Sequence, residues 1–225
     1  MSSDVTSSGT AKAVFLARLR SAIGPGAPPP QRALAVVDRP PDVLPVWTSP
    51  AAPLGERWAS AFEALGGHVH RTRPDGLDDA IAAAVAGRGP VLVDHRFARR
   101  IASESPDEPP WMKWPGCGID AAATAMAGVV EATAGIAATG TIVVDSGRTG
   151  RLVSLLPRVG VFVLREADIV PLTGDILRTH RERWPEGPPT NVVFVTGPSR
   201  SGDIEMRLVV GVHGPGEVHA VLVES

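Results

Sequence analysis

The 225-residue sequence has a single cysteine, Cys117, no tyrosine, and only two lysines, Lys12 and Lys113. One thiol allows no disulfide within the chain. It also cannot hold an iron–sulfur cluster, which usually takes about four thiolates. Aromatic side chains make up only 4% of the residues, so the core must be built mainly from Val, Leu, Ile and Ala. That composition favours buried parallel strands.

Strong charge of one sign is also lacking, since the formal net charge is −2 and the arginines are scattered singly. Without a basic run interleaved with aromatic residues, the composition argues against nucleic-acid binding. No apolar stretch approaches the roughly 18 residues of a membrane span without a Gly, Pro or charged residue. Residues 1–10 lack the charged-then-apolar plan of a secretion signal. We therefore expect a cytoplasmic protein with no membrane span.

The motifs of the common hydrolases and zinc sites, HExxH, CxxC and GxSxG, are absent. His68 and His70 lie two residues apart, on one face of a predicted strand, which resembles a pair of metal ligands. Because no carboxylate follows them at ligand spacing, the sequence predicts no metal site.

What the sequence does contain is an alternation of helical and β-branched segments. Residues 1–30 are predicted to form a tail and a helix that packs on the domain, and residues 31–225 a single α/β domain. Alternation of this kind implies right-handed crossovers and a mostly parallel, doubly wound sheet in a three-layer arrangement. The clearest predicted strands are 90–94, 140–145, 159–164, 191–196 and 218–223, and the clearest helices are 54–65, 77–86 and 173–183.

Two glycine-containing segments follow predicted strands, and in open α/β sheets a ligand binds at the carboxyl ends of the strands. The first segment, 146–151, leads into a short predicted helix. Ser146 and Arg151 could bind a phosphate or carboxylate at the start of that helix. On spacing alone, a plain strand–turn–helix connection with solvated arginines is the favoured interpretation.

The second segment, 197–205, reads GPSRSGDIE. Arg200 stands close to two acids, Asp203 and Glu205, and this arrangement fits either a ligand site or a surface ion pair. His213 follows between glycines and is accessible enough to act as a general base. A lone histidine in a turn is also common without any such role, so both interpretations stay open.

From about Gly128 to the C-terminus the sequence resembles the lactate utilisation protein C family, whose domain is the LUD domain. The resemblance rests on five segments in a fixed order: GVVEATAGIAATGT (128–141), IVVDSGRTGRLVSLLPRV (142–159), IVP (169–171), TGPSRSGDIE (196–205) and GVHGP (211–215).

This resemblance implies a NagB/RpiA/CoA-transferase-like fold, a doubly wound α/β sheet with a partly antiparallel appendage. It also implies a role in oxidising L-lactate to pyruvate with iron–sulfur partner proteins, which agrees with the single cysteine and with the absence of a cofactor in this chain. The family usually carries an acidic pair where this chain has Thr133 and Ala138. An alanine cannot act as a nucleophile, and Glu131 is the nearest replacement, so a binding protein is favoured over an enzyme of that mechanism.

Two hypotheses follow. In the first, the protein is an accessory subunit that binds a small anionic ligand or a partner at the carboxyl edge of the sheet, with His213 as the candidate catalytic residue. In the second, it is a stand-alone enzyme acting on a phosphorylated or CoA-linked small molecule, as the fold analogy suggests. The predicted ligand-binding residues are Thr139, Gly140, Thr141, Ser146, Arg151, Gly197, Ser199, Arg200, Asp203, Glu205 and His213.

Overall fold

The computed structural model describes residues 52–94, 111–147, 150–202, 208–211 and 213–224, and five positions near the N-terminus, 13, 14, 17, 18 and 21. The chain separates into two units, Met1–Pro45 and Val46–Ser225. The five positions of the first unit are helical, while the predicted packing of this helix on the domain lies outside the described residues. The second unit contains every described strand.

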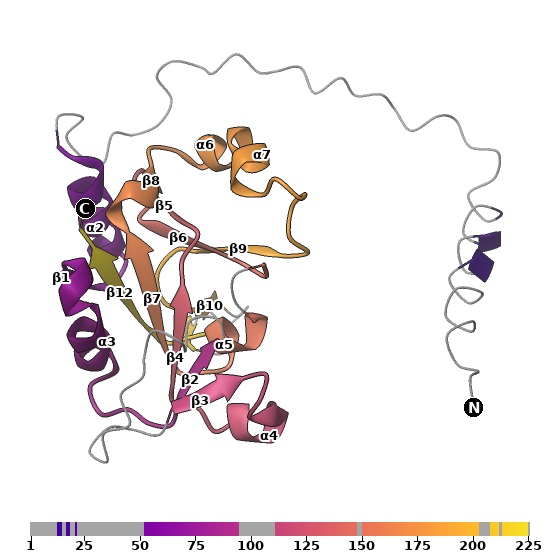
Figure 1. Cartoon of the computed structure of the whole chain (residues 1–225), viewed down its shortest axis with the longest axis horizontal. Coiled ribbons are helices and arrows are strands. Elements are labelled where there is room, and N and C mark those ends of the chain that lie inside the picture. Colours follow the sequence, from indigo (N-terminus) through magenta and orange to yellow (C-terminus); the bar gives the residue numbers. More distant parts are fainter. Residues whose placement is uncertain are drawn as a thin grey trace. The chain divides into compact units, whose positions relative to one another are not determined.

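The main sheet of the second unit has six strands in the order β1-β12-β7-β4-β2-β3 (Figure 1). All five strand pairs are parallel, which confirms the prediction of a mostly parallel sheet. The strands are β1 (His68–Thr72), β2 (Val91–Asp94), β3 (Trp111–Trp114), β4 (Ala127–Glu131), β7 (Val159–Arg165) and β12 (Glu217–Val223).

Helices cover both faces of this sheet, because side chains alternate along each buried strand and both sets are apolar. On one face Leu77, Ile81 and Val85 of α3 (Leu77–Val85), which follows the short helix η1 (Pro74–Gly76), form a cluster with the strands. On the other face Trp58 and Phe62 stack with ring centroids 5.0 Å apart and join a second cluster. The helices contributing to this second cluster are α2 (Leu54–Ala64), α4 (Gly118–Ala122) and α5 (Arg151–Leu155).

A second, four-stranded sheet of mixed direction has the order β8-β5-β6-β9. Ile142 and Val144 on one of its faces join the same cluster as α2, and Ile136 and Val143 on its other face pack with Ile176 of α6. The predicted strands 140–145 and 191–196 belong to this small sheet rather than to the main one. Its elements are β5 (Ala134–Ile136), β6 (Thr141–Asp145), β8 (Ile169–Val170) and β9 (Val192–Val195), with η2 (Glu166–Asp168), α6 (Thr173–Arg178) and α7 (His180–Arg183) alongside.

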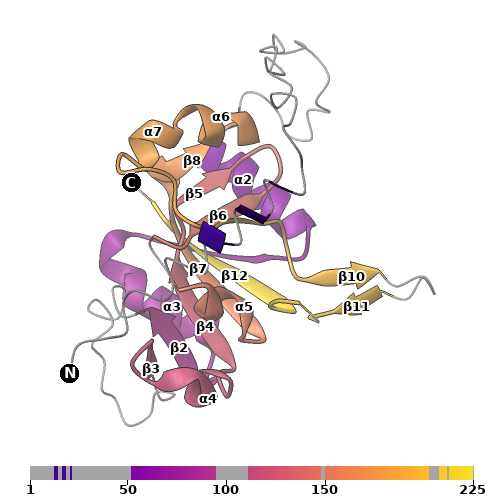
Figure 2. The ribbon, with the colours of Figure 1, turned by 90° about the vertical axis from the view of Figure 1, so that its right-hand side faces the viewer.

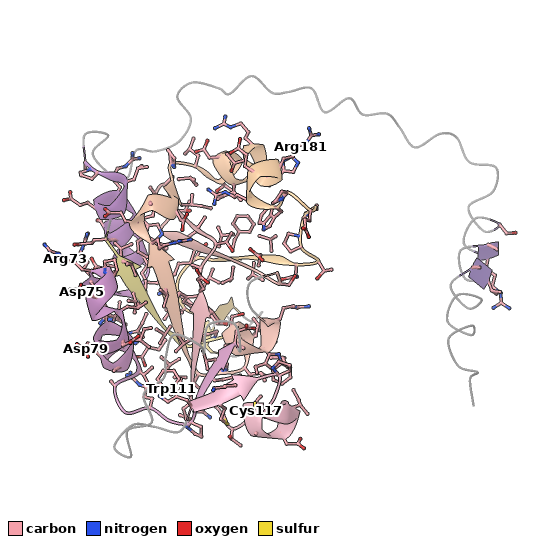
Figure 3. All side chains as sticks on the ribbon, viewed as in Figure 1. Arg73, Asp75, Asp79, Trp111, Cys117 and Arg181 are labelled. Carbon is pink, nitrogen blue, oxygen red and sulfur yellow. The ribbon has the colours of Figure 1, made fainter. Side chains whose placement is uncertain are left out.

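A two-stranded antiparallel hairpin of β10 (Arg200–Gly202) and β11 (Leu208–Val210) extends from the body of this unit (Figure 2). The single cysteine, Cys117, lies in the turn before α4, half-buried (Figure 3). Among the described residues, no helix is both long and apolar enough to cross a membrane.

Candidate functional site

The two predicted ligand segments follow strands that run in opposite directions. β6 pairs with β9 in antiparallel fashion, with Asp145 opposite Val192 and Ile142 opposite Val195. Ser146 and Arg151, which follow β6, therefore lie at one end of the small sheet, and Gly197 and Arg200, which follow β9, lie at the other. At about 3.4 Å per residue, the ends of such a strand pair are roughly 15 Å apart. The predicted convergence of the two segments on one site is wrong for this reason.

The turn before α5 is held by protein groups. The backbone N–H of Gly150 donates to Oδ2 of Asp94, at the carboxyl end of β2, at 2.9 Å, and Ser146 exchanges a hydrogen bond with Thr190. A carboxylate from the chain itself thus stands where an external anion was considered, and α5 is only five residues long. The plain strand–turn–helix interpretation of this segment fits these contacts.

The other end of the small sheet brings several predicted residues together. The turn between β5 and β6 packs on α2 so closely that a Cβ added to Gly140 would stand 2.3 Å from the backbone nitrogen of Phe62. Gly140 also has a φ of +58°, a conformation that favours glycine. The indole Nε1 of Trp58 donates to the backbone oxygen of Thr141 at 3.0 Å. Gly140 is therefore a packing residue, and its role is to place its two threonine neighbours.

Those threonines form a chain of hydroxyls beside a pocket. Thr139 and Thr141 are hydrogen-bonded at 2.7 Å, and Thr141 and Thr196 at 2.8 Å. Thr196, directly after β9, is not among the ligand-binding residues predicted from sequence, although it belongs to the segment TGPSRSGDIE. The pocket has a volume of about 400 Å³, and its lining is otherwise apolar. The lining residues are Ala61, Ala64, Leu65, Ala138, Thr139 and Thr196.

Arg200 of β10 contacts Leu65, one of the residues that line this pocket. Its Nη2 donates to the backbone oxygen of Leu65, at the C-terminal end of α2, at 2.7 Å. The same guanidinium would stand 3.2 Å from a Cβ at Gly66, and a Cβ at Gly197 would meet Leu65 at 3.1 Å. The segment after β9 and the end of α2 are thus in direct contact, so Gly197 and Arg200 lie beside the pocket of Thr139.

Ser199 is hydrogen-bonded to the loop that carries His213. The Ser199 amide donates to the oxygen of Pro215 at 2.8 Å, and the Ser199 oxygen accepts from Gly211 at 2.9 Å. This pairing holds the loop that carries His213 against the start of β10, with the imidazole exposed. Asp203 and Glu205 lie outside the described residues.

The two positions that depart from the expected acidic pair have different surroundings. Thr133 is buried, and its hydroxyl donates to Oδ2 of Asp145 at 2.5 Å. Ala138 contributes its methyl group to the pocket wall. A carboxylate at position 138 would have entered the pocket directly, and this chain offers almost only apolar surface there.

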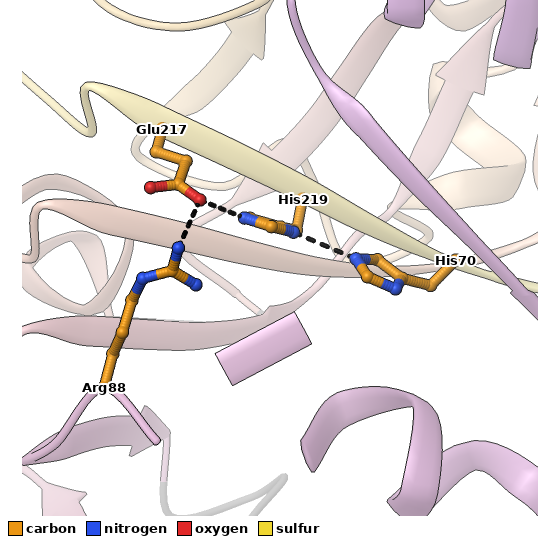
Figure 4. A network of polar contacts seen from close by, with 4 residues as sticks. All are labelled: His70, Arg88, Glu217 and His219. Carbon is orange, nitrogen blue, oxygen red and sulfur yellow. Dashed lines mark hydrogen bonds and ion pairs between the residues drawn. The ribbon is translucent and has the colours of Figure 1, made fainter. Parts of the chain in front are cut away.

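A second polar cluster lies on the edge strand β1 and its neighbour β12, near the amino ends of both strands. His68 and His70 of β1 and Glu217 and His219 of β12 share one face, because β1 and β12 are parallel neighbours with His68 opposite His219. Nε2 of His219 lies 2.7 Å from Oε1 of Glu217, and its Nδ1 lies 2.9 Å from Nε2 of His70 (Figure 4). Arg88 Nη2 completes the chain at 2.8 Å from the same Glu217 oxygen.

These contacts fix which atoms carry protons. A carboxylate only accepts, so Nε2 of His219 donates to Glu217, and Nδ1 of His219 then accepts from Nε2–H of His70. Burial lowers the pKa of His70, and the nearby His68 lowers it further. Burial likewise lowers the pKa of His219, although its hydrogen bond to Glu217 acts in the opposite direction. The hydrogen bond from His219 lowers the pKa of Glu217. Both imidazoles are therefore held neutral.

The fold is that of an α/β protein with a mostly parallel sheet flanked by helices. The LUD domain family model matches residues 55–223, so the chain belongs to the LUD domain family. It is 36% identical over 171 residues to lactate utilization protein C of Bacillus licheniformis, covering 67% of this chain and 70% of that protein. It is 37% identical to the protein of the same name from Geobacillus kaustophilus, covering 59% of this chain and 61% of that relative.

Among solved structures, the chain is similar to a DUF162 family protein from Deinococcus radiodurans, with a TM-score of 0.59 at 20% identity. The match covers 76% of this chain and 96% of the other. At this identity the likeness supports the fold, a mostly parallel sheet flanked by helices.

Proposed function

We propose that the protein takes part in lactate utilisation as an accessory subunit that binds a small carboxylate in the pocket beside α2. The relatives that carry the name lactate utilization protein C support the pathway. The ligand class is inferred from the pocket. Its wall is almost entirely apolar, Thr139 and Thr196 are among the lining residues, and Arg200 is hydrogen-bonded to the lining residue Leu65.

The single observation that carries the ligand class is the position of Arg200 next to an apolar wall. A guanidinium pairs with a carboxylate in a charge-assisted hydrogen bond, and a small organic acid such as lactate or pyruvate adds a methyl group for the apolar surface. A carboxylate at position 138 would repel such a ligand, and this chain has alanine there. The redox chemistry of lactate oxidation is assigned in this proposal to iron–sulfur partner proteins, because a single thiol cannot hold a cluster.

Growth of a deletion strain on L-lactate, with pyruvate as the control carbon source, tests the pathway. We expect growth to fail on lactate alone and to return with the intact gene. Complementation with Arg200→Ala is expected to fail, while Arg181→Ala, an exposed arginine on α7, should restore growth. Equal growth of the deletion strain on both carbon sources would remove the pathway from the proposal.

Direct binding tests the pocket. Titration calorimetry with L-lactate and pyruvate should show one site, and Arg200→Ala should weaken it by roughly tenfold or more, since a hydrogen bond to a charged group contributes about 1.5–3 kcal/mol. A melting panel with phosphate, CoA and sugar phosphates covers the competing hypothesis of a stand-alone enzyme. A ligand at 100 times its Kd adds about 2.7 kcal/mol of stability. Stabilisation by CoA or a sugar phosphate, with no response to lactate or pyruvate, would favour the stand-alone enzyme over the accessory subunit.

A further inference from the structure

The histidine cluster on β1 and β12 is separate from the pocket beside α2 and has the composition of a metal site. His68, His219 and Glu217 each offer one ligand atom, and these atoms all lie within 4.8 Å of one another. His70 lies at the opposite edge of the His219 ring, with its Nε2 2.9 Å from Nδ1 of His219. Two imidazole nitrogens and one carboxylate oxygen are donors that zinc and its neighbours among the divalent transition metals prefer.

We propose that His68, His219 and Glu217 bind one divalent transition-metal ion, with zinc as the best match to the donors, and that His70 orients the His219 ring through its other nitrogen. The two strands preorganise the site, because parallel pairing puts His68 beside His219 and the two-residue period puts Glu217 on the same face. His219 is buried, Glu217 is half-buried, and His68 is exposed. The ion would thus be held against the sheet, with His68 closing over it from solvent.

The spacing of the donors fits such an ion after a small movement. Zinc–nitrogen bonds of about 2.0–2.1 Å in a tetrahedron place the ligand atoms roughly 3.4 Å apart. Nε2 of His219 and Oε1 of Glu217 are at 2.7 Å, and the ligand atoms of His68, Glu217 and His219 all lie within 4.8 Å of one another. The rings of His68 and His219 are already stacked with centroids 4.8 Å apart. Rotation of the exposed His68 ring closes the remaining gap of about 1.4 Å.

Neighbouring residues hold the proposed ligands in place, and a cavity beside the site gives an ion a route of entry. Arg88 is hydrogen-bonded to Glu217 and restrains its carboxylate, as groups behind metal ligands commonly do. Glu217 and Arg88 also line a pocket of about 520 Å³ that includes Arg158, Met126 and Gly216. The site therefore borders a cavity from which an ion could reach it.

The test is metal binding by the untagged full-length protein after treatment with a chelator. Titration with Zn²⁺ is expected to show one ion per chain, and Co²⁺ should give the visible absorption of a tetrahedral complex. His68→Ala, at an exposed position, should weaken binding at least tenfold, and Glu217→Gln should do the same. His180→Ala, an exposed histidine on α7, is the matched control and should bind as the unaltered protein does.

Two results would overturn the proposal. One is a protein that binds neither Zn²⁺ nor Co²⁺ above the level of the His68→Ala/Glu217→Gln double variant. The other is binding that both single variants retain in full, which would place the ion elsewhere. Circular dichroism of each variant establishes that a loss of binding is not a loss of fold, and stability in the presence of Zn²⁺ gives a second readout. Melting should rise with Zn²⁺ in the unaltered protein and stay level in the double variant.

Discussion

At the scale of single residues, Asp145 connects three separate parts of the small-sheet region. Its side chain is buried, and its oxygens accept from the Thr133 hydroxyl at 2.5 Å, the Gly147 amide at 2.8 Å and the Trp184 indole at 3.2 Å. We predict that Asp145→Ala lowers the free energy of unfolding by about 3 kcal/mol, because these donors lose their acceptor in a buried place. Urea denaturation monitored by tryptophan fluorescence measures it.

Thr133→Val is a milder substitution that tests the same network as Asp145→Ala. It removes one donor and keeps the shape of the side chain, so the expected loss is smaller, about 1 kcal/mol. Asp75→Ala, at an exposed aspartate of η1, should change the stability by no more than about 0.5 kcal/mol. If Asp145→Ala behaved like Asp75→Ala, Asp145 would not be the link described above.

At the scale of elements, the turn between β5 and β6 is fitted to α2 through Gly140. We predict that Gly140→Ala destabilises the protein by more than about 2 kcal/mol, since the new methyl group would meet backbone atoms of α2 and the φ of +58° also disfavours it. Gly87→Ala is the matched control, because Gly87 has a φ of +71° and nothing within 4 Å of its added Cβ. Its cost is expected to be about 1 kcal/mol. Equal losses in thermal melting would show that the contact with α2 contributes nothing.

The same elements show how far sequence reasoning reached. Local composition was enough to place strands near 140–145 and 191–196, because β-branched runs mark buried strands wherever they pair. It could not assign them to the small sheet, since β6 and β9 pair across about fifty residues and nothing in either run specifies the partner or its direction. The predicted site was split for that reason, and only its part near Thr139, Gly197 and Arg200 stayed together.

The histidine cluster illustrates the same limit. His68 and His70 have the spacing of a ligand pair, but no carboxylate follows them in the sequence at ligand spacing. Glu217 and His219 arrive from β12, roughly 150 residues later, through the pairing of β1 with β12. The sequence does contain a signal for this cluster: Glu217 and His219 repeat the two-residue spacing of His68 and His70 in a second strand.

At the scale of the whole molecule, this cluster makes stability depend on pH. Because the pKa values of His70 and His219 are lowered in the folded protein, the unfolded chain binds more protons below its own histidine pKa of about 6.5. Stability therefore rises with pH in that range. The contribution of the two histidines to stability should be fully present above pH 6.5. It should be lost as the pH falls from there through the lowered pKa values that His70 and His219 have in the folded protein. The lowered pKa of Glu217 adds a further loss below about pH 4.5, where the unfolded carboxylate protonates first.

Thermal melting from pH 8 to pH 5 in the presence of EDTA tests this without bound metal. The unaltered protein should melt at steadily lower temperature below pH 6.5, and His70→Gln should flatten that slope by removing one of the two titrations. His180→Gln is the control, because His180 is exposed and distant from the cluster along the chain, and its slope should match the unaltered protein. A slope that His70→Gln leaves unchanged would assign the acid sensitivity to other groups. With Zn²⁺ added instead of EDTA, bound metal should steepen the loss of stability in acid, since protons and the ion compete for the same imidazole nitrogens.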